Sequence, residues 1–170
     1  MHAKNQDSEP SSSSSEPVAD RELVIERVID APARLVFLAH SKPEHVTRWF
    51  GPRPYPLTFC EMDFRVGGRF RFAMTGPSGV QNPFFGGEYL EILPDQKIAY
   101  TNGFEAPGSE QMIVTLTFVE RAGKTTLTMH TLFSSIAMKD EHVAMGFKEG
   151  VNIGLDQLVD VVGGLVSGAS

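Results

Sequence analysis

Alternation of apolar and polar residues dominates the middle of the chain. Apolar side chains recur at every second position through residues 69–75, 111–120 and 124–133, and Arg, Thr, Ala and His fill most positions between them. A period of two predicts strands that present one apolar face. Turn residues such as Gly67-Gly68 and Ala122-Gly123 leave only short links between the strands, which favours antiparallel pairing. The strands predicted here are 57–63, 69–75, 84–93, 96–102, 111–120 and 124–133.

A further strand and two short helices are predicted before this region. Residues 23–29 are rich in Val, Ile and Leu, and the run stops at Asp30-Ala31-Pro32. Asp30 is the predicted N-cap of a short helix that ends near Ser41. A second short helix is expected over 42–49, because the Gly-Pro-Arg-Pro segment that follows it interrupts regular structure.

A helical period replaces the alternation after Asp140. Apolar residues recur there every three or four positions, from Phe147 to Leu165, which predicts one long C-terminal helix. Gly146, Gly150 and Gly154 lie four residues apart on it, and each costs about 1 kcal/mol relative to alanine. We therefore expect either close backbone approach or space for a ligand along this stripe.

The first 20 residues differ in composition from the rest of the chain. They contain five consecutive serines and two prolines and almost no apolar side chains, so a flexible polar tail is predicted over 1–20. A chain of 170 residues fits one domain of ordinary size. The predicted organisation is the tail, a single domain over 21–166, and a short tail over 167–170.

Charge and cysteine content exclude several classes of partner. The net charge of −6 provides no basic surface for a nucleic acid or an anionic membrane. No apolar run approaches the roughly 20 residues that span a bilayer, and no export signal is visible. The single cysteine, Cys60, excludes an intramolecular disulfide and fits a reducing cytoplasm.

Three ordered segments carry a resemblance to a known family. They are Trp49-Phe50-Gly51-Pro52, the segment Asp63 to Gly68, and the segment Gly87 to Pro94, followed by the long helix. Over residues 21–166 the chain resembles the SRPBCC (START-like, polyketide cyclase-like) superfamily, in the branch similar to the C-terminal domain of the heat-shock-protein-90 ATPase activator. The resemblance implies an α+β helix-grip fold, in which a curved antiparallel sheet of about seven strands wraps a long C-terminal helix. Members range from binding proteins to cyclases, so the fold transfers more readily than the chemistry.

The leading functional hypothesis is a hydrophobic cavity that binds a small apolar molecule between the sheet and the C-terminal helix. Seven methionines suit an adaptable cavity wall, although they would also fill an ordinary core. Trp49 and Phe50 end the second short helix, where large rings either close the cavity or only pack. The candidate ligand-binding residues are Trp49, Phe50, Phe72, Met74, Phe84, Glu88, Tyr100, Met112, Val114, Met129, Met145 and Gly150.

An alternative hypothesis is a cyclase-like or hydratase-like enzyme that uses Glu88 or Tyr100. If Leu90 and Ile92 face the core, Glu88 joins them, and burial would raise the pKa of its carboxyl group. Otherwise Glu88 lies at a solvated strand end. Tyr100 either directs its hydroxyl into the same space or is satisfied by the backbone. No partner that would orient a pocket acid is apparent, so the binding hypothesis is preferred.

Histidine spacing provides no metal site or cofactor site. His40 and His45 are separated by a proline break, His142 stands near a helix start, and His130 is predicted on the outer face of the sheet. Neither a metal nor a cofactor is therefore expected.

Protein partners follow from the resemblance and the architecture. The eukaryotic activator has a separate N-terminal domain that does much of the chaperone engagement, and 20 polar residues stand in that place here, which speaks against a co-chaperone role. A homodimer formed by pairing of sheet edges is compatible with the predicted architecture.

Overall fold

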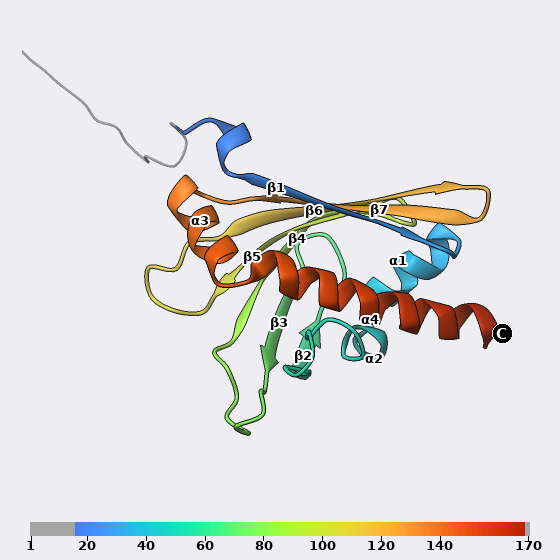
Figure 1. The fold of residues 1–170 in the computed structure, drawn as a ribbon, viewed down its shortest axis with the longest axis horizontal. Coiled ribbons are helices and arrows are strands. Elements are labelled where there is room, and N and C mark those ends of the chain that lie inside the picture. Colours follow the sequence, from blue (N-terminus) through green and yellow to red (C-terminus); the bar gives the residue numbers. More distant parts are fainter. Residues whose placement is uncertain (1–15, 169–170) are drawn as a thin grey trace, which may run out of the picture.

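A computed structural model describes residues 16–168. These residues form a seven-stranded antiparallel sheet in the order β1-β7-β6-β5-β4-β3-β2, with the long helix α4 lying along the sheet (Figure 1). The predicted α+β helix-grip fold is confirmed. The strands are β1 Glu22–Ile29, β2 Leu57–Met62, β3 Arg69–Met74, β4 Phe85–Leu93, β5 Lys97–Phe104, β6 Met112–Arg121 and β7 Lys124–Leu132. The helices are a 3-10 turn at Val18–Asp20, then α1 Ala33–Ser41, α2 Pro43–Val46, α3 Ile136–Ala144 and α4 Phe147–Ser167.

Strand alternation places one face of the sheet in the core. Along β6 the side chains of Met112, Val114, Leu116 and Phe118 are buried, whereas Ile113 is 40% exposed. The link from β6 to β7 needs only two residues, both with positive φ, which suits the right-handed twist of a hairpin. The period-two pattern therefore predicted these strands to within about two residues.

Two consecutive glycines bring β4 very close to both of its neighbours. A Cβ added at Gly86 would overlap the Phe70 carbonyl oxygen in β3, and one added at Gly87 would overlap the Thr101 carbonyl oxygen in β5. The β4–β5 register also shifts between Tyr89 and Glu91. Glycines and bulges of this kind let a sheet curl.

The first helix begins later than predicted and is capped differently. Its N-cap residue is Pro32, not Asp30, and no side chain of the cap residue bonds the helix end. The amide of Ala33 instead donates to Oε1 of Glu120 on β6, at 2.8 Å. α2 ends at Val46, shorter than the predicted span to residue 49. The cap was missed because its partner is 87 residues away in sequence.

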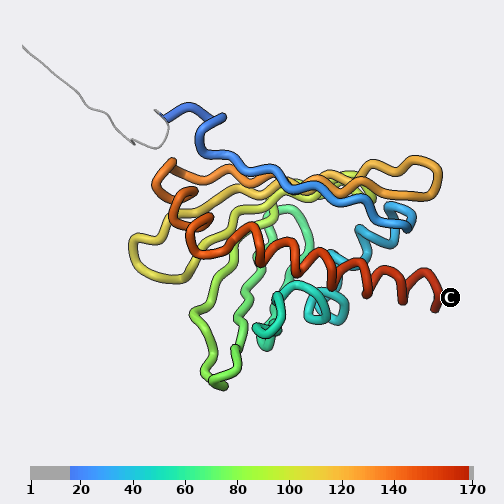
Figure 2. Tube along the Cα trace, viewed as in Figure 1, coloured from blue at the N-terminus to red at the C-terminus, as the bar shows by residue number. Residues whose placement is uncertain are grey.

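The predicted long C-terminal helix is confirmed as α4, but a separate helix, α3, precedes it and was not predicted. Figure 2 shows α3 and α4 as separate coils joined by a tight turn, where Gly146 has a φ of 90°. Ser135 caps α3 by accepting a 3.0 Å hydrogen bond from the amide of Met138. Gly146 therefore breaks the helix and does not belong to a stripe on it.

The two remaining glycines of that stripe lie over the segment that follows α2. A Cβ at Gly154 would be 3.6 Å from the carbonyl oxygens of Trp49 and Phe50, and one at Gly150 would be 3.7 Å from Cγ of Pro52. These are ordinary van der Waals distances. Close backbone approach therefore does not require glycine at either position.

The predicted N-terminal tail overlaps the described residues only at 16–20. The carboxylate of Glu16 accepts a 2.9 Å hydrogen bond from the amide of Ile136, and its carbonyl accepts one from Arg21 Nε at 3.1 Å. Glu16 therefore bonds to the start of α3 and to Arg21. Residues 1–15 and 169–170 of the predicted tails lie outside the described part of the chain.

The core lies between the inner face of the sheet and the helices. Among its largest fully buried side chains are Phe133, from the segment before α3, Ile29 of β1 and Leu158 of α4. Within residues 16–168, no helix has the length and apolar character that crossing a bilayer requires.

Candidate functional site

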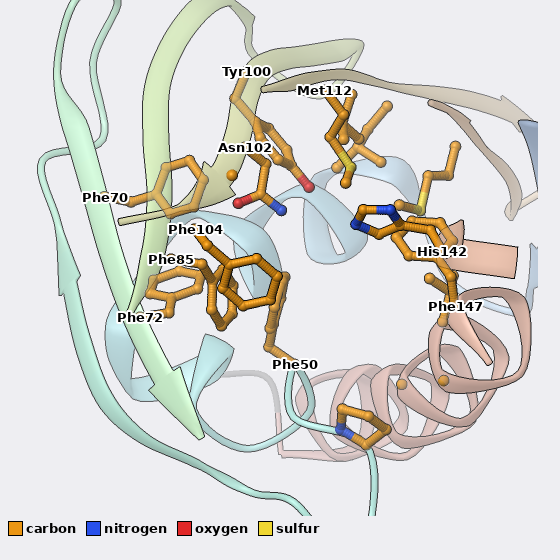
Figure 3. Close-up of a pocket in the computed structure, with 18 of the residues that line it drawn as sticks. Phe50, Phe70, Phe72, Phe85, Tyr100, Asn102, Phe104, Met112, His142 and Phe147 are labelled. Carbon is orange, nitrogen blue, oxygen red and sulfur yellow. The ribbon is translucent and has the colours of Figure 1, made fainter. Parts of the chain in front are cut away.

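A cavity of about 730 Å³ lies between the inner face of the sheet and α4. Pockets that bind small molecules are commonly of this size and mainly apolar. Figure 3 looks into it, with rings from β3, β4 and β5 on one side and His142 and Phe147 on the other. The lining includes Trp49, Phe50, Phe70, Phe72, Met74, Phe85, Tyr89, Tyr100, Asn102, Met112, Val114, Met129, His142, Met145, Phe147 and Gly150.

Aromatic rings in contact with one another form much of the wall. The Phe50 ring lies edge-on to Phe72 with centroids 5.1 Å apart, and its centroid is 6.1 Å from that of Phe85. Phe70 makes an edge contact with Tyr100 at 5.3 Å. Such pairs hold each other in preferred geometries, so this wall is formed in the protein itself.

Polar side chains also lie among these rings, and they include Tyr100 and Asn102 from β5 and His142 from α3 (Figure 3). Tyr100 and Asn102 are two residues apart on one strand and therefore share its inner face. His142 Nδ1 is 2.9 Å from the Met138 carbonyl oxygen. Because a carbonyl only accepts, Nδ1 carries the proton and Nε2 is left as an acceptor.

Burial keeps the two tyrosines of the cavity neutral. It raises the pKa of Tyr100, and it is also the main cause of the raised pKa of Tyr89, with smaller contributions from Tyr100 and Cys60. Both hydroxyl groups therefore remain protonated at neutral pH and are available as donors.

His40 lines the cavity beside Trp49. Its ring centroid lies 4.7 Å from Trp49 and 5.3 Å from Phe118, and Nδ1 donates to the Val36 carbonyl at 2.8 Å. Burial lowers the pKa of His40 to about 4, opposed only in part by the bond to Val36. The ring keeps some accessible surface because it faces the cavity. It is a neutral acceptor at neutral pH.

Acidification is expected to destabilise the protein through His40. The unfolded chain takes up a proton near pH 6.5, whereas the folded protein does so only near pH 4. The stabilisation that the neutral ring provides is therefore complete above about pH 6.5 and is lost as the pH falls towards 4. The loss amounts to about 3 kcal/mol. Urea unfolding across this range should show the dependence in the native protein and a weaker one in His40→Phe.

The matched control for this prediction is His45→Phe, since His45 does not line the cavity. This variant should keep the native pH dependence. A His40→Phe variant with the full native dependence would contradict the assignment.

The cavity contains the predicted ligand-binding residues except Phe84 and Glu88. Phe84 packs against Phe59 at 5.1 Å, and the Arg71 guanidinium lies 3.7 Å from the centre of its ring. Its neighbour Phe85 takes the inward position. The parity predicted for the start of this strand was therefore wrong by one residue.

Glu88, a candidate residue in both the binding and the catalytic hypothesis, does not line the cavity. Its side chain is 46% exposed, with Oε1 4.0 Å from Arg69 Nη1. Tyr89 is buried and faces the cavity, and Leu90 is 43% exposed. The register shift after Tyr89 returns Ile92 to partial burial, so Leu90 and Ile92 do not share a face, and Glu88 is solvated, as the second alternative had it. Of the two candidate catalytic residues, only Tyr100 lines the cavity.

Sequence reasoning missed Asn102, Tyr89, His40 and His142 as lining residues. Asn102 had a usable signal, because it has the same strand parity as Tyr100. The two histidines had none, since each reaches the cavity through the packing of a helix on the sheet. Within residues 16–168, no group of three or more His, Cys, Asp or Glu side chains is arranged to hold a metal ion.

Comparison with known proteins identifies the family. The family model described as Activator of Hsp90 ATPase homolog 1-like protein matches residues 30–163. This agrees with the branch suggested by the Trp-Phe-Gly-Pro segment and the segments that follow it. No curated protein matches the chain.

Solved structures share the fold over nearly the whole chain. A protein from Nitrosomonas europaea is 24% identical, with a TM-score of 0.80 over 88% of this chain and 98% of its own. One from Chromobacterium violaceum is 28% identical, with a TM-score of 0.70 over 84% and 96%. One from Arthrobacter aurescens is 23% identical, with a TM-score of 0.79 over 87% and 89%. The likeness establishes the fold.

Proposed function

Since the chain belongs to the Activator of Hsp90 ATPase homolog 1-like family and has the helix-grip fold, we propose that it binds a small, mainly apolar molecule in the cavity. The observation that carries this proposal is the cavity of about 730 Å³ under α4. Protein interiors are otherwise packed with few spaces larger than a water molecule. A space of this size lined by aromatic rings is a feature that ligand binding explains.

Methionines give part of the wall room to adapt. Met62, Met74, Met112, Met129 and Met145 all line the cavity. The methionine side chain is unbranched and flexible, so it adjusts to ligands of different shape. This favours a binding protein that accepts a class of molecules over one that fits a single rigid shape.

One end of the cavity offers a route for entry. The lining there includes the exposed loop residues Gly108–Glu110 and Met145, which is 68% exposed in the turn between α3 and α4. Phe104, 47% exposed, lies beside them in the lining. Exposed apolar side chains at an opening are typical of a ligand entrance.

A blocking variant tests the proposal. Gly150 lines the cavity, and Pro52 is the only neighbour that an added Cβ would meet within 4 Å, so Gly150→Phe places a ring at the cavity without removing a side chain. Binding of the neutral dye Nile red, followed by fluorescence, should be saturable in the native protein and at least about tenfold weaker in Gly150→Phe. The gain in helix propensity should preserve folding.

The matched control is Gly163→Phe on the same helix. Gly163 is exposed, and an added Cβ would meet nothing within 4 Å. This variant should bind Nile red like the native protein. Absence of saturable binding by the native protein, together with native mass spectrometry that finds no bound dye, would overturn the proposed function.

Family membership favours a chaperone interaction as a second candidate. Its test is the ATPase turnover of heat-shock protein 90 with and without this protein. A saturable increase, unaffected by Gly150→Phe, would support an interaction independent of the cavity. Unchanged turnover and no co-sedimentation would dispose of this candidate.

A further inference from the structure

We propose that the cavity selects neutral aromatic ligands that carry a hydroxyl group, and that Tyr100, Asn102 and His142 bind this hydroxyl. The inference rests on the proposed function, because it specifies which class of small molecule the cavity accepts. Three properties of the described lining support it: unpaired polar atoms, the absence of lysine and arginine, and the direction of the available hydrogen bonds.

Each of these three side chains has a polar atom that makes no hydrogen bond to the described part of the protein. The Asn102 Oδ1 atom is buried and has no hydrogen-bond partner among residues 16–168. The Tyr100 hydroxyl and His142 Nε2 likewise make no hydrogen bond within the described part of the chain, and both side chains point into the cavity (Figure 3). A polar atom left unpaired in an apolar surrounding costs free energy, which a ligand that pairs with it recovers.

Charge in the lining excludes an anionic ligand head. No lysine or arginine belongs to the described lining, so a carboxylate or phosphate in the cavity would have no counter-ion. The only acidic lining residues, Glu110 and Glu141, are exposed and lie at the entrance. Their charges would oppose the entry of an anion. Burying an unpaired charge in an apolar site is far more costly than burying a neutral polar group.

Hydrogen-bond direction points to a hydroxyl group. His142 Nε2 accepts, because Nδ1 donates to Met138, and the amide nitrogen of Asn102, which lies on the cavity side in Figure 3, donates. The Tyr100 hydroxyl is held protonated by burial and donates. A ligand hydroxyl both donates and accepts, so it pairs with either kind of group. An ether oxygen accepts only and leaves His142 Nε2 unpaired.

The rings that surround the polar groups suit an aromatic body. Phe50, Phe72 and Phe85 contact one another with centroids 5.1 to 6.1 Å apart, and Phe70 contacts Tyr100. A further ring in the cavity would extend these edge and offset contacts. A phenol-like molecule therefore satisfies both parts of the lining.

Four naphthalene derivatives of similar size test the inference by displacement of Nile red at neutral pH. 2-Naphthol carries the hydroxyl, 2-methoxynaphthalene lacks its donor, 2-naphthoate is an anion and 2-(aminomethyl)naphthalene is a cation. We expect 2-naphthol to bind about tenfold more tightly than 2-methoxynaphthalene, the ratio that one well-placed hydrogen bond supplies, and more tightly than either ion. Equal affinity of 2-naphthol and the ether, or tighter binding of either ion, would overturn the inference.

Variants assign the effect to named atoms. Tyr100→Phe and His142→Phe each keep a ring and remove one polar group. His142→Phe removes an acceptor that only 2-naphthol can use, so it should weaken 2-naphthol binding several-fold and leave 2-methoxynaphthalene binding unchanged. Tyr100→Phe removes a donor that both oxygens can accept from, so it should weaken the binding of both compounds. His130→Phe makes the same change outside the cavity, where Nε2 is 2.6 Å from Glu22 Oε1, and should alter neither affinity. Equal losses for both ligands in His142→Phe, or no loss for either ligand in Tyr100→Phe, would contradict the assignment.

Failure of this inference is distinguishable from failure of the proposed function. If all four compounds bind with equal affinity and Gly150→Phe weakens each of them, the cavity binds ligands but does not recognise a hydroxyl. If neither Nile red nor any of the four compounds binds, both proposals fall.

Discussion

Replacing Gly87 with alanine is expected to lower the free energy of unfolding by about 3–5 kcal/mol. The new Cβ would lie against the carbonyl carbon and oxygen of Thr101, closer than the 3.0 Å that real Cβ atoms keep. These are backbone atoms of β5, so β4 and β5 would have to separate. The amide of Glu88, which donates to the Thr101 hydroxyl at 3.0 Å, would lose its partner as well. Urea unfolding followed by circular dichroism measures the change.

Gly163→Ala is the matched control for Gly87→Ala. Gly163 lies in α4, it is exposed, and an added Cβ meets nothing within 4 Å. This variant should raise the free energy of unfolding by about 0.5–1 kcal/mol through helix propensity. A Gly87→Ala protein as stable as the native one would show that the two strands do not approach each other as described.

Truncation of Trp49 to alanine is expected to cost about 3–5 kcal/mol of unfolding free energy. The side chain is 7% exposed, and its Nε1 donates to the Ala39 carbonyl of α1 at 2.9 Å. Its ring also contacts His40 at 4.7 Å and Phe50 at 5.6 Å. Trp49 therefore joins α1 to the cavity wall, and the alanine variant loses both the packing and the hydrogen bond. Chemical denaturation measures the loss.

Trp49→Phe separates these two contributions. It retains a ring beside His40 but leaves the Ala39 carbonyl without its donor, so a smaller cost of about 1–3 kcal/mol is expected. If Trp49→Ala and Trp49→Phe are equally destabilising, the hydrogen bond accounts for the whole effect. A cost below about 1 kcal/mol for Trp49→Ala would contradict the buried position of the side chain.

Local patterns were sufficient for most of the strands and for the reversals between them. The β6–β7 hairpin depends on alternation within each strand and on Ala122-Gly123, all within 22 residues of sequence. Side-chain parity also placed Met112, Val114 and Met129 on the cavity side correctly. These features are local, because a strand face repeats every second residue wherever the strand lies.

Errors arose where a distant contact or an irregular register overrides the local pattern. The register shift after Tyr89 lies between Glu88 and Ile92, so the inward position of Ile92 does not imply that Glu88 faces inwards, and Glu88 is exposed. Glu120, from a strand far along the chain, replaced Asp30 as the group that bonds the start of α1. The break at Gly146 was missed because glycine is tolerated inside a helix, and its positive φ is a property of the folded chain.

The sequence by itself determined the fold class, the approximate strands, the long final helix and the apolar character of the sheet's inner face. Only the tertiary structure decided that a cavity of about 730 Å³ lies along this face, and that Tyr100, Asn102 and His142 line it. Periodicity records which side of an element is apolar. The distance between the inner face of the sheet and α4 depends on how β4 curves and where α4 packs. Both depend on residues far apart in the chain.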